Sequence, residues 1–218
     1  MTYNEIKTNS EVKALIRQGN DNLGVLGYTD HSEAHCALVA QRAGSLLQCF
    51  GYPEHDVELV KIAAFLHDIG NAVNRSRHAE YGGILAYSIL KQTDMPLKDA
   101  ITVMTAISNH DESTGGAVDA ISAALIIADK TDVRRNRVRT KEQTAFDIHD
   151  RVNYAVVNSV LSVSSEEKTI TLDITLDDAI CSVLDYFEIF LERMLMCRRA
   201  AEMLGCRFSL LANGSRVL

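Results

Sequence analysis

Residues 57–66 constrain the fold most, because they are apolar on nearly every side of a helix and lead directly into His67 and Asp68. A helix that is apolar all round must lie inside a bundle of other helices. A carboxylate at that depth must be paired, protonated or bound to a metal ion. The sequence therefore predicts a helical bundle that carries ionisable side chains in its interior.

Four further ionisable residues continue the apolar stripes of other predicted helices: His35, His78, His110 and Asp129. One histidine in a core is ordinary. Here, however, five predicted helices each turn an ionisable group inward, and no lysine is positioned to pair with them. This pattern indicates that the groups share a bound cation. Neutral imidazoles and carboxylates are ligands for Fe, Mn, Zn or Mg ions, so the pattern predicts a divalent metal centre in the core.

The order of these residues resembles the H…HD…D signature of the HD-superfamily metal-dependent phosphohydrolases. His35, the sequence Ala64-Phe-Leu-His67-Asp68-Ile-Gly70 and Asp129 carry the resemblance, which extends over residues 28–132. It implies an all-helical core and hydrolysis of a phosphate ester by metal-activated water. The substrate would be a small phosphorylated molecule, with a nucleotide as the first expectation.

By this resemblance, His35, His67, Asp68 and Asp129 would hold the first metal ion. Asp68 would bridge to a second ion bound by His78 and His110, for which a solvent-facing position is the alternative. His31 competes with His35, but we expect it at the exposed start of its helix. Asp132 lies one helical turn after Asp129, so a role in supporting the ligands or binding substrate is an alternative for it, but we expect a cap or surface carboxylate. His149 and Asp150 are expected to be structural.

Basic residues near these ligands are candidates for binding phosphate, because arginine forks match phosphate oxygens. Lys130 follows Asp129 directly, so we expect it to act in catalysis together with His67 and Asp68. The candidate substrate-binding residues are Arg75, Arg77 and Arg134. For the basic run in residues 130–141, a solvated face is an equally good interpretation.

Asn71 departs from the resemblance, because many HD proteins have a lysine at this position. This difference leaves open an alternative of another class, a non-catalytic sensor or assembly module that binds a metal or a nucleotide. RNA binding through the arginine run is a weaker hypothesis, since the net charge is −7. A nucleic-acid partner is therefore unlikely on charge grounds.

Several residues mark the expected ends of helices. Asp30 and Glu33 resemble a capping box for a helix that ends near residue 50, and Pro53 suits the first turn of the next helix. Further helices are expected over residues 79–91, 96–108 and 121–129. Asp119 is the expected cap of the last of these.

After residue 150 the apolar period changes from that of a helix to that of a strand. Residues 169–176 alternate strictly, and residues 154–163 are rich in β-branched side chains, so the two predict a hairpin. A long helix is expected over residues 177–204, followed by a second hairpin at Asn213-Gly214. We therefore predict a mainly α fold, with a helical metal-binding domain over residues 1–145 and a small α+β appendage over residues 146–218. The appendage would pack on the body or form a homodimer contact.

Composition places the chain among globular proteins. It has 218 residues, of which 47% are hydrophobic. No apolar run approaches the roughly 20 residues that cross a bilayer, and the start lacks the pattern of a secretory signal. The five cysteines are widely spaced without a CxxC pair, which indicates reduced core residues. We expect a cytoplasmic protein.

Overall fold

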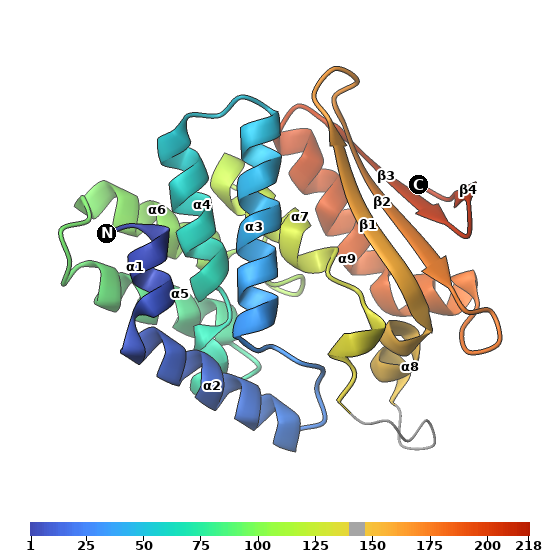
Figure 1. The fold of residues 1–218 in the computed structure, drawn as a ribbon, viewed down its shortest axis with the longest axis horizontal. Helices are drawn as coiled ribbons and strands as arrows, with labels where there is room; N and C mark the ends of the chain where they lie inside the picture. Colours follow the sequence, from blue (N-terminus) through green and yellow to red (C-terminus); the bar gives the residue numbers. More distant parts are fainter. Residues whose placement is uncertain (140–146) are drawn as a thin grey trace.

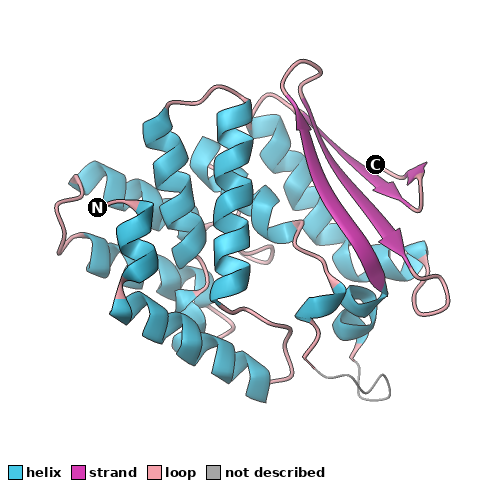
Figure 2. Ribbon diagram, viewed as in Figure 1, coloured by secondary structure: helices cyan, strands magenta, loops and turns pink. Residues whose placement is uncertain are grey.

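Helices dominate the computed structural model, which describes residues 1–139 and 147–218. Figure 2 shows these helices on one side of the molecule and the strands gathered on the other. The predicted mainly α fold is thus confirmed. The elements before the gap are α1 (Tyr3–Thr8), α2 (Ser10–Val25), α3 (Glu33–Cys49), α4 (Glu54–Leu66), the 3-10 turn η1 (Ile69–Ala72), α5 (His78–Leu90), α6 (Leu97–Ser108), α7 (Ala120–Lys130) and the 3-10 turn η2 (Arg135–Arg137).

The apolar helix α4 lies among the other helices, as its sequence predicts. It packs against α1, α3, α6 and α7 (Figure 1). Ile62, Phe65 and Leu66 are fully buried, and each such side chain contributes about 2 kcal/mol to folding. Because α4 ends inside the bundle, His67 and Asp68 begin the next segment at its centre.

The helix caps agree with the sequence only in part. Asp119 caps α7 as expected, since its Oδ1 accepts a hydrogen bond from the backbone N–H of Ser122 at 2.7 Å. The capping box expected at Asp30 is wrong. Ser32 occupies the cap position of α3, and the Asp30 carboxylate instead accepts the Ser32 hydroxyl at 2.6 Å. Pro53 precedes α4 at its cap position and is not in the first turn.

The C-terminal part contains a four-stranded sheet in the order β1-β2-β3-β4. Its elements are α8 (Ile148–Ala155), β1 (Val156–Ser164), β2 (Thr169–Leu176), α9 (Val183–Met203), β3 (Arg207–Ala212) and β4 (Ser215–Arg216). Both predicted hairpins form, and Asn213 and Gly214 turn the second with positive φ angles of 48° and 76°. β3 lies parallel to β2 because α9 crosses over between them.

Helix α9 joins the sheet to the helical body. It packs against α7 and against β3. The helix begins at Val183, later than the predicted residue 177, because Ser182 and Asp185 form a capping box there. The buried apolar side chains of both parts form one continuous core. The appendage therefore packs on the body. The predicted boundary between residues 145 and 146 lies outside the described residues. In the part of the chain that is described, no helix combines the length and apolar character needed to span a membrane.

The close approach of η1 to α5 leads to a prediction about stability. A Cβ on Gly70 would lie 1.9 Å from the carbonyl oxygen of His78 and 2.5 Å from the backbone nitrogen of Gly82. Gly70→Ala must therefore push η1 away from α5, and we expect the free energy of unfolding to fall by about 3 kcal/mol.

Urea denaturation followed by circular dichroism measures this change. Gly116→Ala is the matched control, because a Cβ there meets nothing within 4 Å, and we expect a change below about 0.5 kcal/mol. Equal destabilisation by the two substitutions would contradict the close packing of η1 on α5.

Candidate metal centre

Four buried histidines turn the same ring nitrogen toward a common point. In each of them Nδ1 lies within hydrogen-bond distance of an oxygen that only accepts. These pairs are His35 with Oδ2 of Asp132 at 2.7 Å, His67 with the carbonyl of Ala64 at 2.7 Å, His78 with the carbonyl of Arg75 at 3.0 Å, and His110 with the carbonyl of Ile107 at 2.6 Å. The proton of each neutral imidazole must then reside on Nδ1, which leaves the lone pair of Nε2 facing inward.

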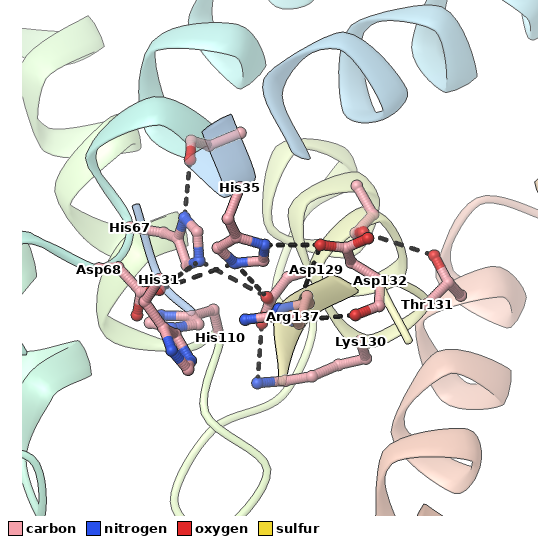
Figure 3. A network of polar contacts seen from close by, with 12 residues as sticks. His31, His35, His67, Asp68, His110, Asp129, Lys130, Thr131, Asp132 and Arg137 are labelled. Atoms are coloured by element: carbon pink, nitrogen blue, oxygen red, sulfur yellow. Dashed lines mark hydrogen bonds and ion pairs between the residues drawn. The ribbon is translucent and has the colours of Figure 1, made fainter. Parts of the chain in front are cut away.

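The first group of inward atoms comes from α3, the end of α4 and α7. Nε2 of His35 lies 3.3 Å from Oδ1 of Asp129, and Nε2 of His67 lies 3.2 Å from Oδ2 of Asp68 (Figure 3). His35, His67 and Asp129 each offer an atom within 4.8 Å of the others. The side chains predicted to bind the first metal ion are thus brought together from separate helices.

These atoms lie close together, but several of them have no hydrogen-bond partner in the described part of the chain. Nε2 of His35, Nε2 of His67 and Oδ2 of Asp68 are buried and, within the described residues, make no hydrogen bond. A buried polar atom without a partner costs about 1–3 kcal/mol. Three such atoms at one point fit a cation that accepts their lone pairs, which is the ligand set expected for a divalent transition metal.

The second group adds the remaining predicted ligands. His67, Asp68 and His110 also offer atoms within 4.8 Å of one another. Nε2 of His78 lies 3.2 Å from Nε2 of His110 and 3.8 Å from Oδ1 of Asp68. Two facing lone pairs repel each other unless a positive charge lies between them. His78 and His110 are 3% and 1% exposed, so both lie in the core and the solvent-facing alternative does not apply.

Asp132 is a buried partner of His35, so its expected position as a cap or surface carboxylate is wrong. Its side chain is fully buried and ion-paired with Arg134 and Arg137. Burial alone would raise the pKa of Asp132, but the His35 hydrogen bond and the Arg137 guanidinium hold it well below its ordinary value. A carboxylate on the outer nitrogen of a ligand histidine orients the ring and raises its basicity.

Asn71 supports Asp68 in a similar way. Its amide nitrogen donates to Oδ1 of Asp68 at 2.8 Å, and its amide oxygen accepts from Arg75 at 3.3 Å. The residue that departs from the family pattern therefore holds a proposed ligand and connects it to a candidate substrate-binding arginine.

The carboxylates also control the charge of His67. Burial alone would lower the pKa of His67, but Asp68 and Asp129 outweigh it and raise the pKa to about 10. The same contacts hold the pKa of Asp68 and of Asp129 well below the ordinary range despite burial. Asp68 and Asp129 are therefore ionised at neutral pH, as metal ligands must be.

A polar cavity of about 260 Å³ adjoins the cluster. Lys130 and Arg75, two of the predicted phosphate-binding residues, line it. Arg77 is exposed outside it, and Arg134 is committed to Asp132 through Nε and Nη2 at 2.5 and 3.0 Å. The lining residues are Gly27, Tyr28, Thr29, His31, Asp68, Arg75, His78, His110, Glu112, Asp129, Lys130, Arg137, Asp147, His149, Asp150, Asn153 and Arg193.

His31 and His149-Asp150 differ from expectation in opposite ways. His31 precedes α3 and lines the cavity, but neither group of ligand atoms found in the described residues includes it. His35 is thus the better first ligand, as predicted. His149 and Asp150, which were expected to be structural, lie in the cavity wall on α8.

Most of the basic run serves to hold loops together. Arg137 and Arg139 donate to the backbone carbonyls of residues 20–30, and Arg135 donates to the carbonyl of Tyr154. Of these arginines, Arg137 lines the cavity. Lys141, the last residue of the predicted run, lies outside the described residues.

Glu112 and Arg193 are site residues that the sequence analysis did not identify. Glu112 binds Nζ of Lys130 at 2.7 Å and Nε of Arg193 at 2.9 Å, while Lys130 also contacts Oδ2 of Asp129 at 2.9 Å. A buried lysine needs a carboxylate partner, so the expected burial of Lys130 could have predicted a role for Glu112 in the loop after His110. Arg193 lies 81 residues further along the chain, and no local pattern connects it to the site.

Comparison with known proteins identifies the family. The HD domain family matches residues 33–188. This range covers more than half of the chain, which therefore belongs to the HD domain family. The resemblance seen in the sequence is thus confirmed, and with it membership of a family of metal-dependent hydrolases.

Two relatives are similar over much of the chain. An uncharacterized protein of Methanocaldococcus jannaschii, MJ1020, is 29% identical, with 82% of this chain and 77% of that protein covered. A predicted HD superfamily hydrolase from an uncultured Thermotogales bacterium, known from its crystal structure, is 22% identical with a TM-score of 0.45. That match covers 57% of this chain and 67% of the other.

The converging lone pairs lead to a prediction about metal binding. Mn²⁺ at 100 times its dissociation constant should raise the free energy of unfolding by about 2.7 kcal/mol. Asp129→Asn removes a ligand charge and should abolish most of this gain, whereas Asp173→Asn on β2 should retain it. Thermal unfolding with and without Mn²⁺ measures the difference, and the same gain in both variants would contradict the site.

The contacts of Glu112 lead to a prediction about pH. Burial alone would raise the pKa of Glu112, but Lys130 and Arg193 hold it well below its ordinary value. A lowered folded-state pKa stabilises the fold above the ordinary pKa, and this contribution is lost as the pH falls through the lowered value. Glu112→Gln should therefore cost about 2 kcal/mol at pH 7, and this difference should shrink as the pH falls from 5 to 3.

Urea titrations in the presence of a chelator, repeated across that pH range, test this effect. Glu192→Gln on the exposed side of α9 is the control and should behave as the wild type. A cost for Glu112→Gln that stays constant down to pH 3 would show that the carboxylate charge is not stabilising.

Proposed function

We propose that the protein is a metal-dependent phosphohydrolase that cleaves a small phosphate ester. The observation that carries this proposal is the convergence of inward Nε2 atoms and carboxylates beside a cavity that also holds Lys130 and Arg75. Membership of the HD domain family supports the same class of activity. The substrate is a small phosphorylated molecule, a nucleotide in the first instance.

His35, His67, Asp68 and Asp129 would hold one ion, and His78 and His110 would hold a second that shares Asp68. A bound divalent metal lowers the pKa of water and neutralises charge on phosphoryl oxygens. Four imidazoles favour Fe, Mn or Zn over Mg, which prefers oxygen ligands. Asp132 and Asn71 keep the ligands oriented, as their hydrogen bonds to His35 and Asp68 indicate.

Lys130 is the protein cation best placed to act on the substrate. Its Nζ is fixed between Asp129 and Glu112, so its position is determined before any ligand arrives. Burial alone would lower the pKa of Lys130, but the two carboxylates raise it, so the side chain stays charged at neutral pH. A fixed positive charge beside the reacting phosphate stabilises the charge of its transition state. We also propose a cytoplasmic location, to which the five free cysteines are suited.

Hydrolysis of a phosphate ester tests the proposal. Purified protein with Mn²⁺ should hydrolyse p-nitrophenyl phosphate, its bis-ester or a nucleoside monophosphate, and a chelator should abolish the activity. Asp68→Ala removes the proposed shared ligand and should lower kcat/KM by about 10³-fold, whereas Asp173→Ala should leave it unchanged.

Full activity in Asp68→Ala, or no metal-dependent turnover of any ester by the wild type, would contradict the proposed function. Tight nucleotide binding without hydrolysis would favour the alternative, a metal- or nucleotide-binding sensor.

A further inference from the structure

Arg193 reaches the cavity from a part of the chain beyond the family match. The HD domain family matches residues 33–188, whereas Arg193 lies further along α9. Its side chain lines the cavity together with Lys130, Asp129 and His110. The C-terminal part of the chain, which was expected to serve association, thus supplies a charged group to the candidate site.

The position of Arg193 is fixed by two contacts. Its Nε donates to Oε1 of Glu112 at 2.9 Å, and its Cζ lies 4.6 Å from the ring centroid of Phe190, one helical turn earlier. The other carboxylate oxygen of Glu112 binds Lys130 at 2.7 Å. Glu112 therefore holds two cations next to each other, and Asp129 also contacts Lys130, at 2.9 Å.

The guanidinium of Arg193 has donors to spare. Within the described residues, no protein acceptor pairs with its two Nη groups, so four of the five N–H donors remain for a ligand. Arg137, which also lines the cavity, differs in this respect. Its Nε, Nη1 and Nη2 all donate to the backbone carbonyls of Asp30 and Asp132.

We infer that Arg193 binds the anionic oxygens of the substrate phosphate. The planar guanidinium fork matches two phosphate oxygens, and Arg193, whose Nη groups are unpaired within the described residues, lines the same cavity as Lys130. The inference rests on the proposed function for the identity of the ligand. It assigns substrate recognition to α9 and therefore to the C-terminal part of the chain.

Binding of inorganic phosphate to the Mn²⁺-saturated protein tests this role by calorimetry. Arg193→Met should raise the dissociation constant of phosphate about tenfold to 100-fold, since it removes charge-assisted hydrogen bonds. Arg198→Met is the matched control, because Arg198 is exposed on the same helix, and it should bind as the wild type does. Arg193→Lys keeps the charge but loses the fork, so its affinity should fall between the two.

Kinetics on a hydrolysed ester provides a second readout. Arg193→Met should raise KM by a similar factor and change kcat less than about threefold, as expected for lost uniform binding. Thermal unfolding of each variant shows whether it folds, and Arg193→Lys carries the test if Arg193→Met does not fold.

The outcomes separate this inference from the proposed function. Phosphate binding that depends on Arg193 supports the inference even if no ester is hydrolysed. An active wild type whose phosphate affinity and KM are unchanged in folded Arg193→Met and Arg193→Lys would overturn the inference and leave the proposed function intact. Absence of saturable phosphate binding to the wild type would also overturn it.

Discussion

The inward lone pairs of four histidines are the constraint on which the structure depends. Each neutral imidazole donates a hydrogen bond from Nδ1–H to an oxygen atom. In three of them this oxygen is a backbone carbonyl near the end of the same helix. Local backbone geometry thus sets the neutral tautomer of these three rings and Asp132 sets that of His35, so the Nε2 atom of each neutral ring carries a lone pair. A cluster of acceptors in an apolar interior is stable only with a positive charge at its centre. A metal ion bound among these atoms would supply that charge.

The fold brings these acceptors together by packing helices closely around one apolar segment. α4 delivers His67 and Asp68 to the centre of the bundle, and α3 and α7 pack beside it with His35 and Asp129. The contact between η1 and α5 at Gly70 sets His78 against Asp68. A second layer of polar residues then fixes the first. Asp132 and Asn71 are two members of this layer, and Glu112 is a third that extends it to α9.

The sequence predicted the helical body, the strand pairs and the six candidate ligands that the fold brings together, because each leaves a local pattern. A histidine in an apolar stripe is visible within one helix, and strict alternation is visible within one strand. Contacts that join distant segments left no such pattern. Asp132 lies 97 residues from His35, and its burial depends on arginines that the sequence could not place. The same holds for Arg193. The capping box at Asp30 failed because Ser32, two residues later, competes for the same position.

Anomalous X-ray diffraction from crystals of the protein grown with Mn²⁺, Fe²⁺ or Zn²⁺ tests the central claim most directly. We expect a peak in the anomalous difference map within about 2.0–2.3 Å of Nε2 of His35 and His67 and of the carboxylates of Asp68 and Asp129. A metal-soaked crystal with no peak at this point, or with metal bound only at surface carboxylates, would show that these side chains do not converge on a cation.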